Sequence, residues 1–161
     1  MRSYNIFMLL FIVFGASIVY TSPVNADEKI ILSKGQTIYV PAYSHIYAGN
    51  REMPILLTVT VSIRNTDQKN SIKVPKVDYY ETQGAIVKRF IDSEVNLKPL
   101  ESIRYVIPTK DKTGGSGANF IVEWKSDNFV NPPIVETVMI GAESQQGISF
   151  TSRGQPIVST E

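Results

Sequence analysis

The sequence has no cysteine among its 161 residues. This absence excludes disulfide bonds, cysteine-ligated zinc, iron–sulfur clusters and thiol catalysis. Histidine occurs once, at His45, and tryptophan once, at Trp124. A metal site needs two or more side-chain ligands, and His45 has no second histidine to join it. We therefore predict no cofactor and a fold that is held together by core packing alone.

An excess of charge of one sign is also missing, because 16 basic residues stand against 15 acidic ones. Proteins that hold nucleic acid need clustered lysine and arginine to neutralise phosphates. The sequence has no such cluster and no polybasic segment for an anionic lipid surface. We therefore predict that nucleic acid is not a partner.

A long hydrophobic run occurs only at the N-terminus, where Arg2 precedes the uncharged residues 6–20 and a small-residue site, VNA, at 24–26. This order is typical of a secretory signal peptide. The run is shorter than the ~20 residues of a membrane-spanning helix, which favours cleavage over an anchor. We predict a signal peptide at 1–26, a single domain at 27–161 and a periplasmic or secreted location. A membrane contact is then expected only through an uncleaved signal segment.

Helical periodicity is nearly absent, and alternation of apolar and polar residues takes its place. In LTVTVSIR, residues 57–64, Leu57, Val59, Val61 and Ile63 fall on one face and polar side chains on the other. Successive side chains of a strand point to opposite faces, so this pattern predicts a half-buried antiparallel strand.

Further strands are predicted at 71–81, 85–92, 95–97, 103–107, 119–125, 134–142 and 147–154. Pro75 cannot donate a ladder hydrogen bond, so its strand is an edge or carries a bulge. Residues 82–84 predict a turn, 98–100 a tight corner, and the glycine-rich residues 111–117 a flexible hairpin loop.

About seven to nine short strands at even spacing indicate an all-β, Ig-like antiparallel sandwich, with a closed barrel as the alternative. The predicted core comprises Leu57, Val59, Val61, Ile63, Phe90, Ile103, Tyr105, Ile121, Trp124 and Val138.

The stretch YVPAYSHIYAG, residues 39–49, is unusual because it holds the only histidine and three tyrosines. Pro41 argues against a helix and confines the segment to an edge or an irregular crossing. In an extended segment, Tyr43, His45 and Tyr47 share one face, and small or aliphatic residues share the other. We prefer the interpretation in which the aromatic face packs inward, because tyrosine is common in strands.

The other interpretation turns the small face inward and leaves the aromatic face as a platform for a sugar, a peptide or a protein. If the chain has a binding surface, we expect it at Tyr43, His45 and Tyr47, joined by Ser116 and Asn119 of the glycine-rich loop.

Two other functions stay open. One is a small cell-envelope hydrolase with His45 as general base. Against it, the sequence has no G-x-S-x-G elbow, and the adjacent Ser44 is expected to point away from His45 on the opposite face of the strand. The other is a periplasmic metal carrier that uses His45 with a methionine and carboxylates, for which no spacing signature exists.

Six segments together carry a family resemblance. They are YVPAYSHIY, LTVTVSIRNTD, VDYY, GGSGANFIVEW, ETVMIGA and QQGISFTSRG. From residue 35 to 157, the chain resembles an uncharacterised family of bacterial exported proteins, a domain of unknown function. The resemblance implies a bacterial source and an extracytoplasmic location, and it implies no activity, ligand residue or cofactor. We therefore expect a non-enzymatic binding or accessory module whose partner is an envelope protein or a small ligand.

Overall fold

The computed structural model describes residues 31–49, 53–142 and 147–157. The predicted signal peptide lies outside these residues. The described residues form twelve strands and no helix, which confirms the all-β class. In this part of the chain, no helix has the length and hydropathy that a membrane crossing requires.

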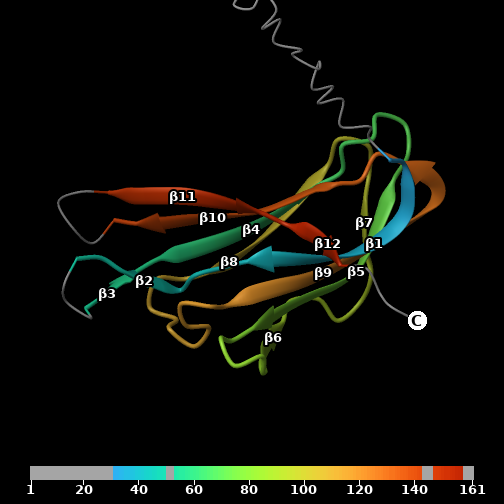
Figure 1. Cartoon of the computed structure of the whole chain (residues 1–161). Coiled ribbons are helices and arrows are strands. Elements are labelled where there is room, and N and C mark those ends of the chain that lie inside the picture. The colour runs from blue at the N-terminus through green and yellow to red at the C-terminus, as the bar shows by residue number, and fades with distance from the viewer. Residues whose placement is uncertain (1–30, 50–52, 143–146, 158–161) are drawn as a thin grey trace, which may run out of the picture.

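The strands follow one another along the chain with short connections (Figure 1). In order they are β1 (Ser33–Pro41), β2 (His45–Tyr47), β3 (Pro54–Leu56), β4 (Thr58–Arg64), β5 (Ile72–Tyr80), β6 (Ile86–Arg89), β7 (Val95–Leu97), β8 (Ser102–Ile107), β9 (Asn119–Val130), β10 (Ile134–Gly141), β11 (Ile148–Arg153) and β12 (Gln155–Ile157).

Two antiparallel sheets make up most of the molecule. The first has the order β12-β1-β9-β5-β6, with β7 also paired to β5. The second has the order β11-β10-β4-β8, and β2 and β3 form a separate hairpin. Figure 1 shows the two large sheets one above the other, with the β2–β3 hairpin at one end.

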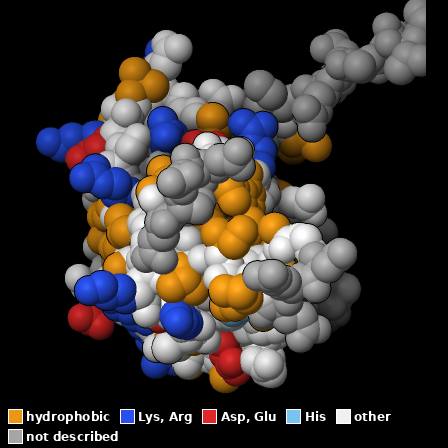
Figure 2. All heavy atoms as spheres, turned by 90° about the vertical axis from the view of Figure 1, so that its left-hand side faces the viewer, with side chains coloured by type: hydrophobic (Ala, Val, Ile, Leu, Met, Phe, Trp, Pro, Cys, Tyr) orange, Lys and Arg blue, Asp and Glu red, His pale blue; other side chains and the backbone are white. Residues whose placement is uncertain are grey.

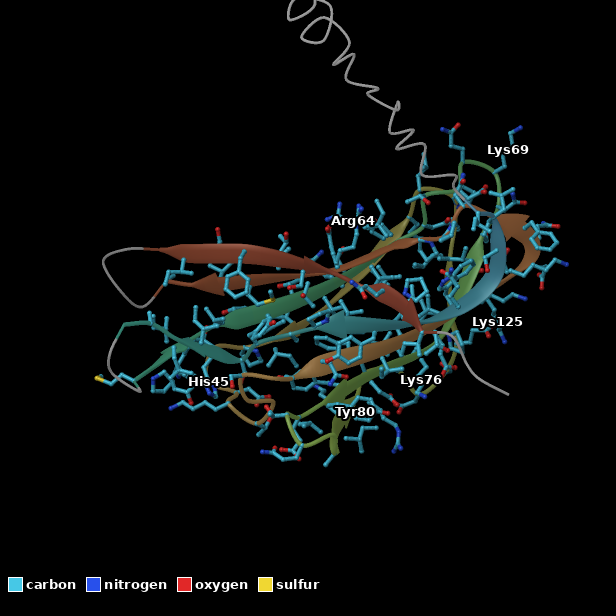
Figure 3. All side chains as sticks on the ribbon, in the orientation of Figure 1. His45, Arg64, Lys69, Lys76, Tyr80 and Lys125 are labelled. Carbon is cyan, nitrogen blue, oxygen red and sulfur yellow. The ribbon has the colours of Figure 1, made fainter. Side chains whose placement is uncertain are left out.

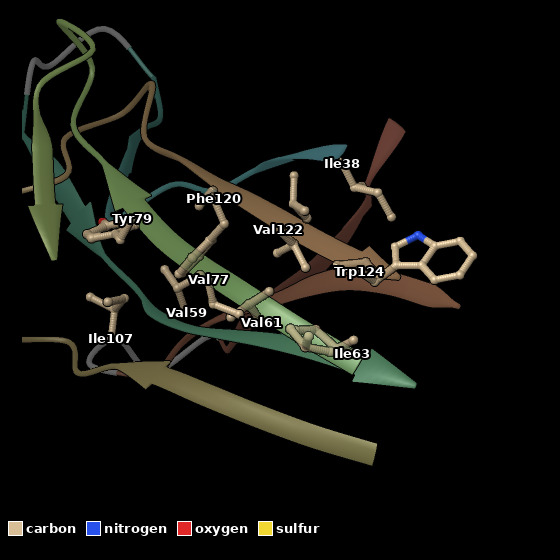
Figure 4. Close-up of a cluster of buried hydrophobic side chains, with 14 of the residues drawn as sticks. Ile38, Val59, Val61, Ile63, Val77, Tyr79, Ile107, Phe120, Val122 and Trp124 are labelled. Carbon is tan, nitrogen blue, oxygen red and sulfur yellow. The ribbon is translucent and has the colours of Figure 1, made fainter. Parts of the chain in front are cut away.

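The hydrophobic core lies between the two sheets (Figure 4). From β4, the alternate residues Val59, Val61 and Ile63 are fully buried, as the alternating pattern predicted. Phe120 and Val122 of β9 belong to the same buried cluster. Burial of each such aliphatic side chain contributes about 1.5–3 kcal/mol to the free energy of unfolding. The core thus supplies the stability of a chain that has no disulfide bonds.

Two predicted core residues are wrong, each by one position along its strand. In β9 the buried side chains are Phe120, Val122 and Trp124, so Ile121 points to the other face. Residues an odd number apart in a regular strand cannot share a face. In β10 the inward position belongs to Thr137 rather than Val138, and Thr137 Oγ1 donates to the Pro41 carbonyl at 2.6 Å.

Phe90, Ile103 and Tyr105 are half-buried and pack against the core, and the rings of Phe90 and Tyr105 lie 5.0 Å apart. Leu57 and Trp124 are buried as predicted.

The strands outnumber the predicted seven to nine because the chain breaks where it changes sheet. After β11, Gly154 carries the chain to β12 in the other sheet, where a Cβ would approach Ile38 Cγ2 to 2.6 Å. The strand with Pro75 is interior rather than an edge, because β5 pairs with β9 on one side and with β6 and β7 on the other. Its register shifts between Lys73 and Lys76, so the bulge was the correct alternative.

Candidate binding site

The stretch 39–49 presents its small residues to the interior. Val40, Ala42 and Ser44 are fully buried, whereas Tyr39 is 39% exposed and Tyr47 is 54% exposed. The preferred interpretation, an inward aromatic face, is therefore wrong for these tyrosines. Val40 and Ala42 belong to the hydrophobic core between the two sheets, and the Ala42 amide donates to the Ala118 carbonyl at 2.8 Å.

Tyr43 departs from the rest of the aromatic face. Its side chain is half-buried and packs against the core, with its ring 5.9 Å from that of Phe150. It therefore supports the second sheet and contributes little exposed surface.

His45 and Tyr47 are held together on the β2–β3 hairpin. His45 Nε2 lies 3.2 Å from the Tyr47 hydroxyl, and the two rings meet edge to face at 5.3 Å. Their positions two residues apart in β2 place them on the same face. Figure 3 shows His45 at one end of the sheets, with Lys69 and Lys125 at the other end.

Ser44 connects this hairpin to the glycine-rich loop. Its amide and its hydroxyl both donate to the Gly115 carbonyl at 3.0 Å, and its own carbonyl accepts from the Leu57 amide at 3.0 Å. Contrary to the sequence prediction, Ser44 Oγ approaches His45 Nδ1 to 3.5 Å. The hydroxyl is fully buried and bonded to Gly115, so it does not face a substrate.

The loop at 111–117 connects β8 of one sheet with β9 of the other, and so it is not the flexible hairpin loop that we predicted. On the side opposite Ser44, Thr82 anchors it. The Thr82 amide and hydroxyl donate to the Gly114 carbonyl at 3.0 Å, and the Gly117 amide donates to Thr82 Oγ1 at 3.0 Å. Gly115 has φ +77°, a conformation that glycine adopts without strain.

These segments line an open hollow of about 230 Å³, which we name the His45 hollow. It is lined by His45, residues 81–83 and residues 113–116. The structure thus brings together His45 and Ser116, two of the predicted site residues, and Tyr47 adjoins them through His45. Tyr43 does not line the hollow, and Asn119 lies in β9, opposite Pro41 and Tyr80.

Sequence reasoning missed Glu81, Thr82, Gln83 and Thr113. Residues 82–84 were recognised as a turn, and Gly84 at φ +89° bears this out. No local pattern could show that this turn lies beside a loop some thirty residues further along the chain.

Beneath the hollow lies Tyr79 of β5, whose side chain is 0% exposed and stacks on Phe120 at 4.9 Å. A Cβ on Gly114 would overlap the Tyr79 hydroxyl, so the backbone of Gly114 lies directly against this hydroxyl. Within the described residues this hydroxyl has no hydrogen-bond partner. Burial, and secondarily the Asp111 carboxylate, raises the pKa of Tyr79 to about 12. The phenol is therefore neutral at physiological pH.

A family model described as "Protein of unknown function (DUF3124)" matches residues 35–157. The chain belongs to this family. Membership confirms the resemblance to an uncharacterised family. Among solved structures, the chain is similar to one titled "Crystal Structure of Thermotoga maritima 1070", at 13% sequence identity and a TM-score of 0.44. The similarity covers 77% of this chain and 96% of the other. No curated protein matches the chain.

In this family member, the His45 hollow carries hydroxyl, amide, imidazole and carboxylate groups, and Glu81 is the charged residue in its lining. No lysine or arginine lines it. Within the described residues, no three histidine, aspartate or glutamate side chains are grouped as a metal site requires. The lining thus offers hydrogen bonds in both directions without a cationic charge to hold an anion.

The same end of the molecule also exposes apolar side chains. Tyr47, Met53 and Ile140 are each about half exposed or more, and they lie in or next to β2, β3 and β10. Figure 2 views this end and shows hydrophobic side chains gathered at its centre. Exposed apolar patches on a folded protein mark surfaces that bind a ligand or a protein.

Proposed function

We propose that the chain is an exported, extracytoplasmic binding module with an Ig-like sandwich fold, and that it binds a small ligand at the His45 hollow without catalysing a reaction. One observation carries the proposal: three segments far apart in the sequence, around residues 45, 82 and 115, converge on one hollow and are bonded to one another there. The export component rests on the N-terminal pattern of Arg2, an apolar run and a small-residue cleavage site.

The Ig-like component rests on two antiparallel sheets around one core, with connections that pass from one sheet to the other. Loops gather at the ends of such sandwiches, where variation changes binding and leaves the core intact. The His45 hollow lies at such an end.

Binding is favoured over hydrolysis by the surroundings of His45. A general base needs an accessible hydroxyl or water and a group that orients the imidazole. The described hydroxyl nearest to Nδ1 belongs to the buried Ser44, and Nε2 faces the Tyr47 hydroxyl. Both ring nitrogens thus face hydroxyl groups of the protein. These hydroxyls hold the imidazole in one orientation, as suits a residue that lines a binding site.

The test is an NMR titration of the full-length ¹⁵N-labelled protein with single sugars, amino acids and dipeptides. We expect shifts in the amides of 81–83 and 113–116 and in the His45 ring. Ser116→Ala should weaken binding about two- to tenfold, the value of one hydrogen bond. His45→Ala should weaken binding to a similar extent, because it removes the imidazole from the lining of the hollow and the partner that orients Tyr47. Lys69→Ala, at the opposite end in Figure 3, is the control and should bind as the parent does.

Shifts confined to other surfaces, or equal binding by His45→Ala and the parent, would remove the His45 hollow as the site. If the parent protein converts a titrated compound to product and His45→Ala does not, the chain is a hydrolase instead.

A further inference from the structure

The lining of the His45 hollow selects the chemistry of its ligand. Gln83 offers a donor and an acceptor, Ser116 offers a hydroxyl, and Glu81 offers an acceptor, all from residues that line the hollow. No lysine or arginine of the lining balances a ligand anion, and Glu81 repels one. Alternating donors and acceptors on a neutral ligand suit this lining, and that is the chemistry of a polyhydroxyl compound.

The volume of the hollow and the surface beside it limit the size and shape of the ligand. The hollow, at about 230 Å³, is smaller than the ~300–1,000 Å³ of sites for drug-sized molecules. It therefore fits one ring rather than an extended chain. Beside His45, the half-exposed Tyr47 ring supplies an apolar face at the rim. The C–H face of a sugar ring packs against such an aromatic surface while its hydroxyls bond to polar groups.

The second, independent observation is the unpartnered Tyr79 hydroxyl. Buried polar groups without a partner are uncommon in native proteins and call for an explanation. This hydroxyl is fully buried and lies against Gly114, a residue of the hollow's lining, where a Cβ would overlap it. The arrangement leaves a donor ready for a ligand oxygen once the Gly114 peptide tilts.

We propose that the His45 hollow binds one neutral sugar ring, and that a sugar hydroxyl completes the hydrogen bonding of Tyr79. This inference rests on the proposed function and adds the ligand class and the buried contact. Binding tilts the Gly114 peptide and weakens the hydrogen bonds that its carbonyl accepts from Thr82, and the hydrogen bond gained by Tyr79 offsets that loss.

The test uses a matched series of sugars: glucose and N-acetylglucosamine, which are neutral, and glucuronate, which adds a negative charge to the same ring. Binding to the full-length protein is followed by NMR shifts of residues 81–83 and 113–116. We expect a neutral sugar to bind, and glucuronate to bind at least about tenfold more weakly because it faces Glu81.

Two tyrosine variants test the buried contact. Tyr79→Phe should weaken sugar binding about tenfold, the value of one buried hydrogen bond, while its urea midpoint is unchanged or higher. Tyr80→Phe, the next residue of β5 on its opposite face, is the matched control and should bind sugar as the parent does. Equal sugar binding by Tyr79→Phe and the parent would refute the role of Tyr79.

The outcomes separate this inference from the proposed function. If amino acids or dipeptides shift the residues of the hollow and no sugar does, the sugar class is wrong and the binding site stands. If sugars bind but neither His45→Ala nor Ser116→Ala weakens them, the site itself is wrong.

Discussion

Replacing Gly114 with alanine isolates the fit between the glycine-rich loop and Tyr79. A Cβ at Gly114 would overlap the Tyr79 hydroxyl and would lie 2.5 Å from Tyr79 Cζ and 2.8 Å from Ala118 Cβ. The backbone of Gly114 is outside the left-handed region, so the effect is one of packing rather than of φ. Inserting a methyl group into a packed site costs about 1–3 kcal/mol. The ring of Tyr79 is stacked on Phe120 and has little freedom to move, so we expect a loss of about 3 kcal/mol.

Equilibrium unfolding in urea measures this loss. Trp124 is the only tryptophan and is 2% exposed, so its fluorescence reports directly on the core. Gly147→Ala is the control, because a Cβ there meets nothing within 4 Å and the backbone is not left-handed. The control should keep its stability or gain about 0.4–1 kcal/mol. A Gly114→Ala protein within about 0.5 kcal/mol of the parent would refute the packing argument, because surface substitutions produce changes of that size.

A double variant identifies the neighbour. Tyr79→Phe removes the hydroxyl that overlaps the new methyl group and leaves the longer, 2.5 Å contact with the ring carbon Cζ. The pair Gly114→Ala and Tyr79→Phe should therefore be coupled by about 0.5–3 kcal/mol, with part of the loss recovered. Strict additivity of the two changes in unfolding free energy would show that the loop accommodates the methyl group at a contact other than the Tyr79 hydroxyl.

Two further predictions concern pH. Burial raises the pKa of Tyr79 to about 12 from 10.0, so its contribution to stability is complete below pH 10 and is lost as the pH rises through about 12. Urea midpoints between pH 9 and 12 should fall less steeply in Tyr79→Phe than in Tyr80→Phe, and equal slopes would contradict the assignment. Hydrogen bonds from the Lys69 amide and, second, from the Asn70 amide lower the pKa of Asp67 below 3.8. The contribution of Asp67 to the free energy of unfolding is therefore full above that pH and is lost as the pH falls through the lowered pKa. Asp67→Asn should lower the urea midpoint at pH 7 and make the midpoint fall less steeply below pH 4. Asp92 is exposed, so Asp92→Asn is the control and should behave as the parent does. An acid profile of Asp67→Asn equal to that of the parent would count against this role of Asp67.

The sequence by itself determined the local elements. The alternation in residues 57–64 predicts the buried face of β4 because the period of a strand is two, and one buried face requires one apolar parity. Backbone chemistry placed the turn at 82–84 and the tight corner at 98–100, where Gly84 and Leu100 have positive φ. These features depend on neighbours in the chain, so a single sequence shows them.

Only the tertiary structure decided which segments meet and which faces turn inward. In residues 39–47 the pattern defines two faces, and the packing of the two sheets around one core, together with the bonds from Ser44 to Gly115, buries the small one. The same long-range bonds bring His45 to Ser116 and to the turn at residues 81–83. Those contacts join residues that are 32 to 71 positions apart, so they form only when the whole chain has folded and leave no periodic trace in the sequence.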